Sequence, residues 1–397
     1  MTRLRFCLVF LLLWPALLSI ACRPVAELPR EESWRPYAPD PAGRDESSFL
    51  DDLDYHSLEQ AVTRSIAFYE QQGARGSYCY RDRCRTAAEM IADLREFLRI
   101  AGSDRPAPER EKAVREKFLF LPAAEEVLVT GYYEPILNGA LHKSERFRYP
   151  IYRPPPEAVV VRLDRFAPKY GNDRLIGQVR KGEVLPLPTR REIDGEGALQ
   201  GRGLEIAWVD DPVALFSLHV QGSGKIRLPD GRMIRVTYAQ SNGRPFRGLT
   251  AMMADRGLLK EGERSYELMK KTLYERAPEE RQELMNFNER YIFFRVVPEG
   301  PLGALGLPLV AGRSIAADLD LYPRGGLAML KTRKPVFDRE GNIVSWQSFT
   351  RFVLNQDAGA AIKGPGRIDL FCGTGPEAER TAGAMKEKGE LYFLFRK

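Results

Sequence analysis

Two aspartates near the C-terminus are the side chains best placed in this sequence for proton-transfer chemistry. Asp357 ends one apolar run, Asp369 lies in the next, and the loop between them consists mainly of small residues. Strand ends can hold carboxylates rigidly beside a groove, and a partly desolvated aspartate has a raised pKa and can act as a general acid. On spacing alone, ordinary turn chemistry is the commoner explanation of a glycine-rich loop with aspartates.

Two further segments carry side chains suited to binding a carbohydrate. Tyr132 and Tyr133 follow one another at the end of an apolar run, where an aromatic ring can stack on a sugar face. Gln221 and Ser223 offer an amide and a hydroxyl in a glycine-flanked turn, which suits hydrogen bonding to sugar substituents. The alternatives are core packing for the tyrosines and backbone capping for the turn, and both are common.

Other catalytic machinery is not evident. The sequence has no G-x-S-x-G elbow, no H-E-x-x-H motif and no phosphate-binding loop. Its three histidines do not stand at ligand spacing with one another or with a cysteine, so we expect no metal and no cofactor. His219 beside Ser223 is the one local pair that could belong to a nucleophilic triad, and this signal is weak.

The N-terminus has the pattern of an export signal. Two arginines precede an apolar run too short to span a bilayer, and small residues lead to Cys22. We predict a signal peptide over 1–21, a lipid-modified Cys22 and a proline- and charge-rich tether over 22–45. Arg23 favours the periplasmic face of the outer membrane. The alternative is an ordinary cleaved signal and a soluble periplasmic protein.

Composition indicates a folded body without a nucleic-acid partner. The 397 residues include 60 basic and 54 acidic side chains, a net charge of +6 without a basic run. A mild positive field suits an anionic polymer, although a mixed-charge solvated surface explains the same count. In an oxidising compartment a Cys79–Cys84 disulfide is plausible, provided that the geometry permits the short loop.

The order of the elements predicts helices first and mainly strands afterwards. Capping boxes at Ser57–Gln60 and Thr86–Glu89 open two helices, and a third is expected over 109–118. Turn residues at Pro229–Gly231 indicate a hairpin, and a helical interlude is expected over 265–287. The predicted strands lie in the segments 127–133, 149–152, 159–163, 225–239, 290–297 and 349–357.

Taken together, these segments resemble the murein lytic transglycosylase A family over most of the mature chain. The resemblance implies a mainly β fold, in which a double-psi β-barrel is built from 46–137, with the N-terminal helices, and from 298–397. A smaller β domain, 138–297, is inserted between them, with a substrate groove at the junction. The residues that carry the resemblance are 130–135, 149–152, 216–224, Tyr238, Ala239, Asn242, Gly243, 310–317 and 357–375.

The resemblance also implies an activity and its residues. Asp369 maps onto the family's catalytic acid and Asp357 onto its companion, although Ala360 and Cys372 depart from the usual pattern. The implied reaction cleaves the bond between N-acetylmuramic acid and N-acetylglucosamine and leaves a 1,6-anhydro ring. The expected partners are peptidoglycan strands, outer-membrane lipid and wall-synthesis proteins. The expected substrate-binding residues are Thr130, Tyr132, Tyr133, Gln221, Ser223 and Lys363.

Two alternatives stay open at this point. An inverting hydrolase would use Asp369 as acid and Asp357 as base, and its product would carry one more water. A non-catalytic wall-binding lipoprotein could use the same scaffold, because a fold does not dictate a function.

Overall fold

The computed structural model describes residues 51–73, 76–171, 173–259 and 265–397. The predicted signal peptide, the anchor Cys22 and the tether lie outside the described residues. Among the described helices, none combines the length and apolar character that crossing a membrane requires.

Six strands close into a barrel, which confirms the predicted mainly β fold. They pair in the order β15-β16-β14-β17-β4-β18, and β18 pairs back onto β15, while β3 adds to the outer edge of β18. Strand alternation turns Val129, Ile315 and Ile368 into the barrel, where each is fully buried in one apolar cluster. The strands are β3 (Phe118–Pro122), β4 (Val127–Glu134), β14 (Ser314–Ala316), β15 (Leu327–Phe337), β16 (Ile343–Asp357), β17 (Arg367–Thr374) and β18 (Lys386–Arg396).

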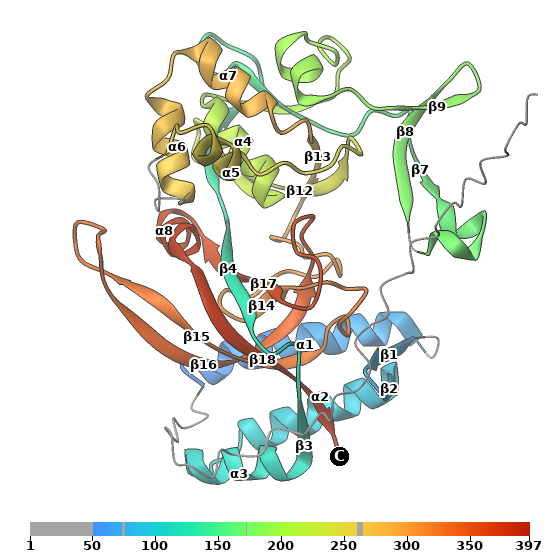
Figure 1. The fold of residues 1–397 in the computed structure, drawn as a ribbon, viewed down its shortest axis with the longest axis vertical. Helices are drawn as coiled ribbons and strands as arrows, with labels where there is room; N and C mark the ends of the chain where they lie inside the picture. Colours follow the sequence, from blue (N-terminus) through green and yellow to red (C-terminus); the bar gives the residue numbers. More distant parts are fainter. Residues whose placement is uncertain (1–50, 74–75, 172, 260–264) are drawn as a thin grey trace, which may run out of the picture. The chain divides into compact units, whose positions relative to one another are not determined.

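A second sheet is formed between β4 and β14 in the chain, and it has its own core. Figure 1 shows β4 running from the barrel to the elements of this insert. The sheet order is β13-β12-β11-β5-β10-β6, and the hairpin predicted around Pro229–Gly231 is confirmed as β11–β12. Its strands are β5 (Ile136–Ala140), β6 (Tyr149–Tyr152), β10 (Glu205–Val209), β11 (Ser223–Arg227), β12 (Met233–Ser241) and β13 (Ile292–Val297).

Helices cover this sheet and pack with one another. The helical interlude predicted over 265–287 is confirmed as α6 and α7, and α4 and α5 precede it. Buried side chains of all four helices form one apolar cluster that includes Phe216, Met253 and Leu273. The helices are α4 (Pro212–Gln221), α5 (Leu249–Asp255), α6 (Tyr266–Tyr274) and α7 (Pro278–Asn286).

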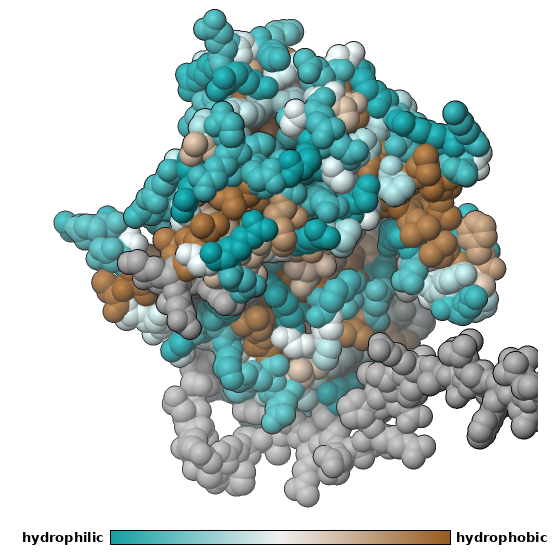
Figure 2. Space-filling view, turned by 45° about the horizontal axis from the view of Figure 1, so that its top comes forward, coloured by the Kyte–Doolittle hydropathy of each residue, from teal (hydrophilic) through white to brown (hydrophobic). Residues whose placement is uncertain are grey.

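A small three-stranded sheet exposes apolar side chains. It consists of β7 (Ala158–Arg162), β8 (Arg174–Arg180) and β9 (Glu183–Pro186). Figure 2 shows apolar surface on the right, where Figure 1 draws β7 and β8. Val160 and Leu175 are about half exposed there, because only a few apolar residues of this sheet, such as Ile176, pack against the core of the insert.

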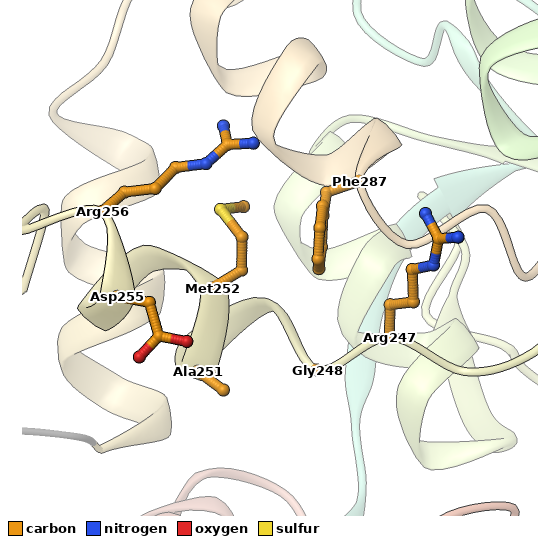
Figure 3. A pocket seen from close by; sticks show the side chains of 7 residues that line it. All are labelled: Arg247, Gly248, Ala251, Met252, Asp255, Arg256 and Phe287. Carbon is orange, nitrogen blue, oxygen red and sulfur yellow. The ribbon is translucent and has the colours of Figure 1, made fainter.

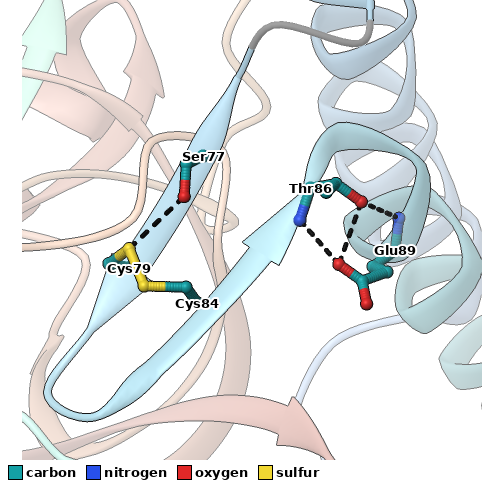
Figure 4. Close-up of a disulfide and its surroundings, with 5 residues drawn as sticks. All are labelled: Ser77, Cys79, Cys84, Thr86 and Glu89. Atoms are coloured by element: carbon teal, nitrogen blue, oxygen red, sulfur yellow. Dashed lines mark hydrogen bonds between the residues drawn. A yellow bond between two sulfur atoms is a disulfide. The ribbon is translucent and has the colours of Figure 1, made fainter.

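In the described part of the chain, three helices and a hairpin precede the barrel. They are α1 (Tyr55–Gln72), β1 (Ser77–Tyr80), β2 (Arg83–Thr86), α2 (Ala87–Ala101) and α3 (Ala107–Lys117). The capping box of Thr86 and Glu89 is confirmed, as is the Cys79–Cys84 disulfide, which joins directly opposed residues of the hairpin (Figure 4). The predicted box at Ser57–Gln60 is wrong. Asp54 caps α1 by accepting from the Ser57 backbone N–H, so the helix begins earlier than predicted.

A fully buried arginine fixes the start of α1 to the barrel. The Arg313 guanidinium pairs with the Asp51 carboxylate and donates to the backbone oxygens of Asp54 and Phe352. Beside it, Arg351 forms a two-pronged pair with Asp52, both distances 2.7 Å. A buried guanidinium is tolerated only when its donors are satisfied, so this contact ties the N-terminal helices to β14 and β16.

We expect Arg313→Leu to lower the free energy of unfolding by about 3 kcal/mol or more, because the Asp51 carboxylate and two carbonyls lose their donor. Urea denaturation followed by circular dichroism measures the change. Arg339→Leu, in the exposed turn between β15 and β16, is the matched control and should stay within about 0.5 kcal/mol. Equal effects of the two substitutions would show that the buried network contributes nothing.

Candidate active site

Strand register brings the two predicted aspartates to the sides of one barrel strand. Ala316 on β14 pairs with Asp357 of the parallel strand β16 and with Asp369 of the antiparallel strand β17. Because β16 and β17 lie on opposite sides of β14, the Cα atoms of Asp357 and Asp369 are roughly 10 Å apart. The pairing on β16 skips one residue between Asn355 and Asp357, and such a bulge re-aims the side chain that follows it.

Asp369 is a partly exposed carboxylate with one side-chain donor. The Thr130 hydroxyl, on the neighbouring strand β4, donates to Asp369 Oδ1. Burial raises the pKa of Asp369 to about 6, the Arg367 charge lowers it, and the Asp357 charge raises it further. A carboxyl with this pKa is still at least half protonated up to about pH 6, so it can donate a proton.

Asp357 is held by three donors. The Tyr132 hydroxyl donates to Oδ2 at 2.8 Å, and the backbone N–H groups of Ala304 and Ala358 donate to Oδ1 at 2.9 and 2.8 Å. Burial raises the pKa of Asp357 to about 6, while these three hydrogen bonds lower it. The donors all favour the charged form, and Asp369 receives fewer of them. The hydrogen bonding therefore favours Asp369 as the proton carrier and Asp357 as its charged neighbour.

The alternation of β4 separates its two tyrosines. Thr130 and Tyr132 share the face that carries the carboxylates, where each reaches one aspartate. Tyr133 lies on the opposite face, 2% exposed, against Ala378 and Ala382 of α8 (Pro376–Ala384). Tyr133 is therefore a packing residue, and a sugar has no access to its ring.

The predicted turn at Gln221 and Ser223 lies where the insert meets the barrel. Gln221 Oε1 accepts from the Tyr133 backbone N–H at 3.0 Å, one residue beyond Tyr132. Lys225 on β11 pairs with the buried Glu134 at the end of β4, at 3.2 Å. Ser223 is itself buried at the start of β11. These contacts make the turn part of the junction between the two sheets.

Lys363 belongs to the loop that joins the two aspartates. Its side chain is 63% exposed, and its ammonium lies 3.3 Å from Asp318 and 3.6 Å from Asp320. Asp318 also accepts from the Gly364 backbone N–H at 3.0 Å. These interactions hold the loop beside Asp369 and leave the ammonium accessible to a ligand.

The His219–Ser223 pair does not form a triad. His219 is buried in the insert, and its Nδ1 lies 2.9 Å from the fully buried Arg190 guanidinium. Burial lowers the pKa of His219, and the Arg190 charge lowers it further, so the ring is neutral. Within the described ranges, no group of three or more histidine, cysteine or acidic side chains could hold a metal ion.

The insert also contains a cavity of about 440 Å³ that includes none of the predicted site residues. Figure 3 shows Arg247 and Arg256 on either side of the Phe287 ring. Arg247 pairs with Glu289 at 3.2 Å. The predicted groove between barrel and insert stays a prediction.

Sequence reasoning missed the backbone donor at Ala304 and the charge of Arg367 next to Asp369. Ala304 acts through its N–H, so its residue type carries no signal. The alternation of β17 could have indicated Arg367, because it stands two residues before Asp369 and shares its face.

Comparison with family models matches two parts of the chain. The model described as the MltA specific insert domain matches residues 128–295, and the model described as the 3D domain matches residues 313–395. The membrane-bound lytic murein transglycosylase A of Escherichia coli K12 is 30% identical over 270 residues. That match covers 68% of this chain and 65% of the relative, which is slightly less than two thirds of the relative's length.

Solved structures resemble nearly the whole chain. A membrane-bound lytic murein transglycosylase from Agrobacterium tumefaciens is 32% identical with a TM-score of 0.71, covering 89% of this chain and 97% of its own. MltA from Neisseria gonorrhoeae is 28% identical with a TM-score of 0.63, covering 86% of both chains.

The raised pKa of Asp369 predicts a pH-dependent effect on stability. The folded protein retains a proton that the unfolded chain releases between pH 3.8 and about 6, so the free energy of unfolding falls as pH rises through that window. We expect Asp369→Asn to be more stable than the parent at pH 7 and to lose this advantage near pH 4. Urea denaturation at both pH values measures the difference.

Asp338, a surface residue in the turn between β15 and β16, provides the control. Hydrogen bonds from the Asn342 side chain and backbone lower the pKa of Asp338, so its contribution is lost as pH falls. Asp338→Asn should therefore change stability in the opposite direction at pH 7. An Asp369→Asn difference that does not vary with pH would contradict the raised pKa.

Proposed function

The chain belongs to the membrane-bound lytic murein transglycosylase A family, and from this membership and the carboxylate pair we propose that it is a peptidoglycan lytic transglycosylase. It cleaves the β-1,4 bond between N-acetylmuramic acid and N-acetylglucosamine. The observation that carries this proposal is the register at Ala316, which sets two partly exposed carboxylates of raised pKa beside one barrel strand.

Asp369 acts first as an acid and then as a base. Its proton goes to the bridging oxygen as the bond from that oxygen to the muramic C1 breaks. The muramic C6 hydroxyl then bonds to C1, and its proton returns to the Asp369 carboxylate. One carboxylate is sufficient, because the nucleophile belongs to the substrate, and an intramolecular attack has a high effective molarity. The single hydrogen bond from Thr130 orients Asp369 without engaging both of its oxygens.

Asp357 stabilises the cation that develops at C1. Its charge is fixed by the donors on Tyr132, Ala304 and Ala358, so little reorganisation is needed during the reaction. Charge on Asp357 also raises the pKa of Asp369 and so keeps the acid protonated. Tyr132 is therefore a positioning residue for Asp357.

Substrate contacts come from the edges of this site. Thr130 and the exposed Lys363 ammonium face polar groups of the glycan, and Gln221 and Ser223 support the junction from the insert. Acylated Cys22 anchors the chain at the periplasmic face of the outer membrane, in line with the description of the E. coli relative as membrane-bound. The barrel then works on peptidoglycan within reach of the tether. We propose wall-synthesis proteins as further partners of the anchored chain.

We expect Asp369→Asn to lower the release of 1,6-anhydromuropeptides from purified sacculi by about 10³-fold, because the amide cannot donate the proton. Asp357→Asn should cause a smaller loss, because the acid remains. Liquid chromatography with mass spectrometry measures the products. Asp338→Asn, a surface aspartate in the β15–β16 turn, is the matched control and should keep the parent rate.

Product mass separates the alternatives. A hydrolase that uses Asp357 as base would release products one water heavier, with reducing ends. A wall-binding protein without activity would bind sacculi and release nothing. Parent-level activity in Asp369→Asn would show that another group is the acid.

The pH dependence of the rate should follow the acid. Since Asp369 must carry a proton and its pKa is raised to about 6, kcat/KM should fall as pH rises above about 6. Initial rates on sacculi between pH 4 and 8 measure this limb. Asp338→Asn should leave the profile unchanged, and a rate that stays constant up to pH 8 would contradict the assignment.

A further inference from the structure

A polar cavity of about 540 Å³ lies beside the carboxylate site. Its walls come from the end of α1, from β1 of the disulfide hairpin, and from the segments 304–305 and 319–324 on either side of β14 in the sequence. Ala304 lines the cavity, and its backbone N–H donates to Asp357. Asp320 lines it as well and lies 3.6 Å from Lys363, on the loop that joins the two aspartates. The cavity and the carboxylate site therefore share a wall.

The lining offers amide, hydroxyl and guanidinium groups. Gln72 and Ser77 are exposed, and so is Arg324, whose guanidinium forms no ion pair within the described part of the chain. Burial raises the pKa of Tyr78, and the Arg324 charge lowers it, so the guanidinium lies close to this phenol. Arg324 is thus a cation available to an anionic group in the cavity.

The wall around Arg324 is built from mutually supporting contacts. Tyr69 donates to the Arg324 backbone oxygen at 2.7 Å, and its ring packs edge-on against Tyr78 with centroids 4.7 Å apart. Cys79 lines the cavity, and its bond to Cys84 holds the hairpin (Figure 4). The hairpin precedes both ranges that the family models match.

The aromatic side chains of this wall do not suit another sugar. Phe68, Tyr78 and Tyr322 are each at most 8% exposed, so none offers an open face for stacking on a sugar ring. The volume lies in the range of small-molecule sites, about 300–1,000 Å³. The exposed Arg324 guanidinium instead matches a carboxylate, and the Gln72 amide and the Ser77 hydroxyl can donate to peptide carbonyls.

We propose that this cavity binds the peptide stem of N-acetylmuramic acid, with Arg324 receiving a stem carboxylate. The inference rests on the proposed function, because the muramic sugar at the carboxylates carries its stem on a lactyl group close to the reacting bond. A stem that leaves the sugar on the Ala304 side enters the cavity directly. The chain then prefers glycan strands that still carry peptides.

The test compares two polymers. One is glycan strands that bear their stems, and the other is the same strands stripped by an N-acetylmuramoyl-L-alanine amidase. We expect Arg324→Ala to lower kcat/KM about tenfold on the stem-bearing strands, as loss of one charge-assisted hydrogen bond predicts. On stripped strands the change should stay within about twofold. Arg339→Ala, an exposed arginine in the β15–β16 turn, should change neither rate.

Equal losses on both polymers, or no loss on the stem-bearing one, would overturn the inference. If the parent cleaves neither polymer, the proposed function is overturned instead. A direct titration then still decides on the cavity. The free tripeptide L-alanyl-γ-D-glutamyl-diaminopimelate should bind to the Asp369→Asn chain in calorimetry and lose at least about tenfold in affinity when Arg324→Ala is added. Absence of binding to Asp369→Asn alone would overturn the stem site.

Discussion

A three-residue strand is the constraint on which the carboxylate site depends. β14 pairs with β16 on one side and β17 on the other, so Ala316 stands between Asp357 and Asp369. Arg313 directly precedes this strand, and its guanidinium connects the strand to the start of α1. Barrel closure and helix docking therefore both determine the distance between the two aspartates.

The same burial that prepares the carboxylates acts against the stability of the fold at neutral pH. Both aspartates have a pKa raised to about 6, so the folded state carries charge there at a cost in free energy. Two fully buried arginines have their charge compensated. Arg190 is satisfied by backbone oxygens and by His219, and Arg313 by a carboxylate and carbonyls. At Asp357 and Asp369 burial instead raises the pKa of both carboxyls, and such a loss of stability is typical of active sites.

Much of the fold and part of the site could be predicted from the sequence. The β11–β12 hairpin, the Thr86–Glu89 capping box and the Cys79–Cys84 bridge depend on residues a few positions apart, so local patterns were sufficient. The start of α1 was not predicted correctly, because Asp54 and Ser57 are both good capping residues. Which of the two residues caps the helix depends on Arg313, whose guanidinium donates to the Ser57 hydroxyl. Arg313 is 256 residues away from Ser57 in the sequence.

By itself the sequence determined which residue types were available: two aspartates on consecutive strands and aromatic residues at the end of β4. Tertiary structure alone decided their partners. It separated Tyr132, which holds Asp357, from Tyr133, which packs under α8, and it brought the Ala304 backbone to the same carboxylate. Periodicity assigns a side chain to a face of a strand, but which face lies against another layer depends on how distant segments pack. Desolvation, and with it the pKa of each aspartate, arises only after that packing is complete.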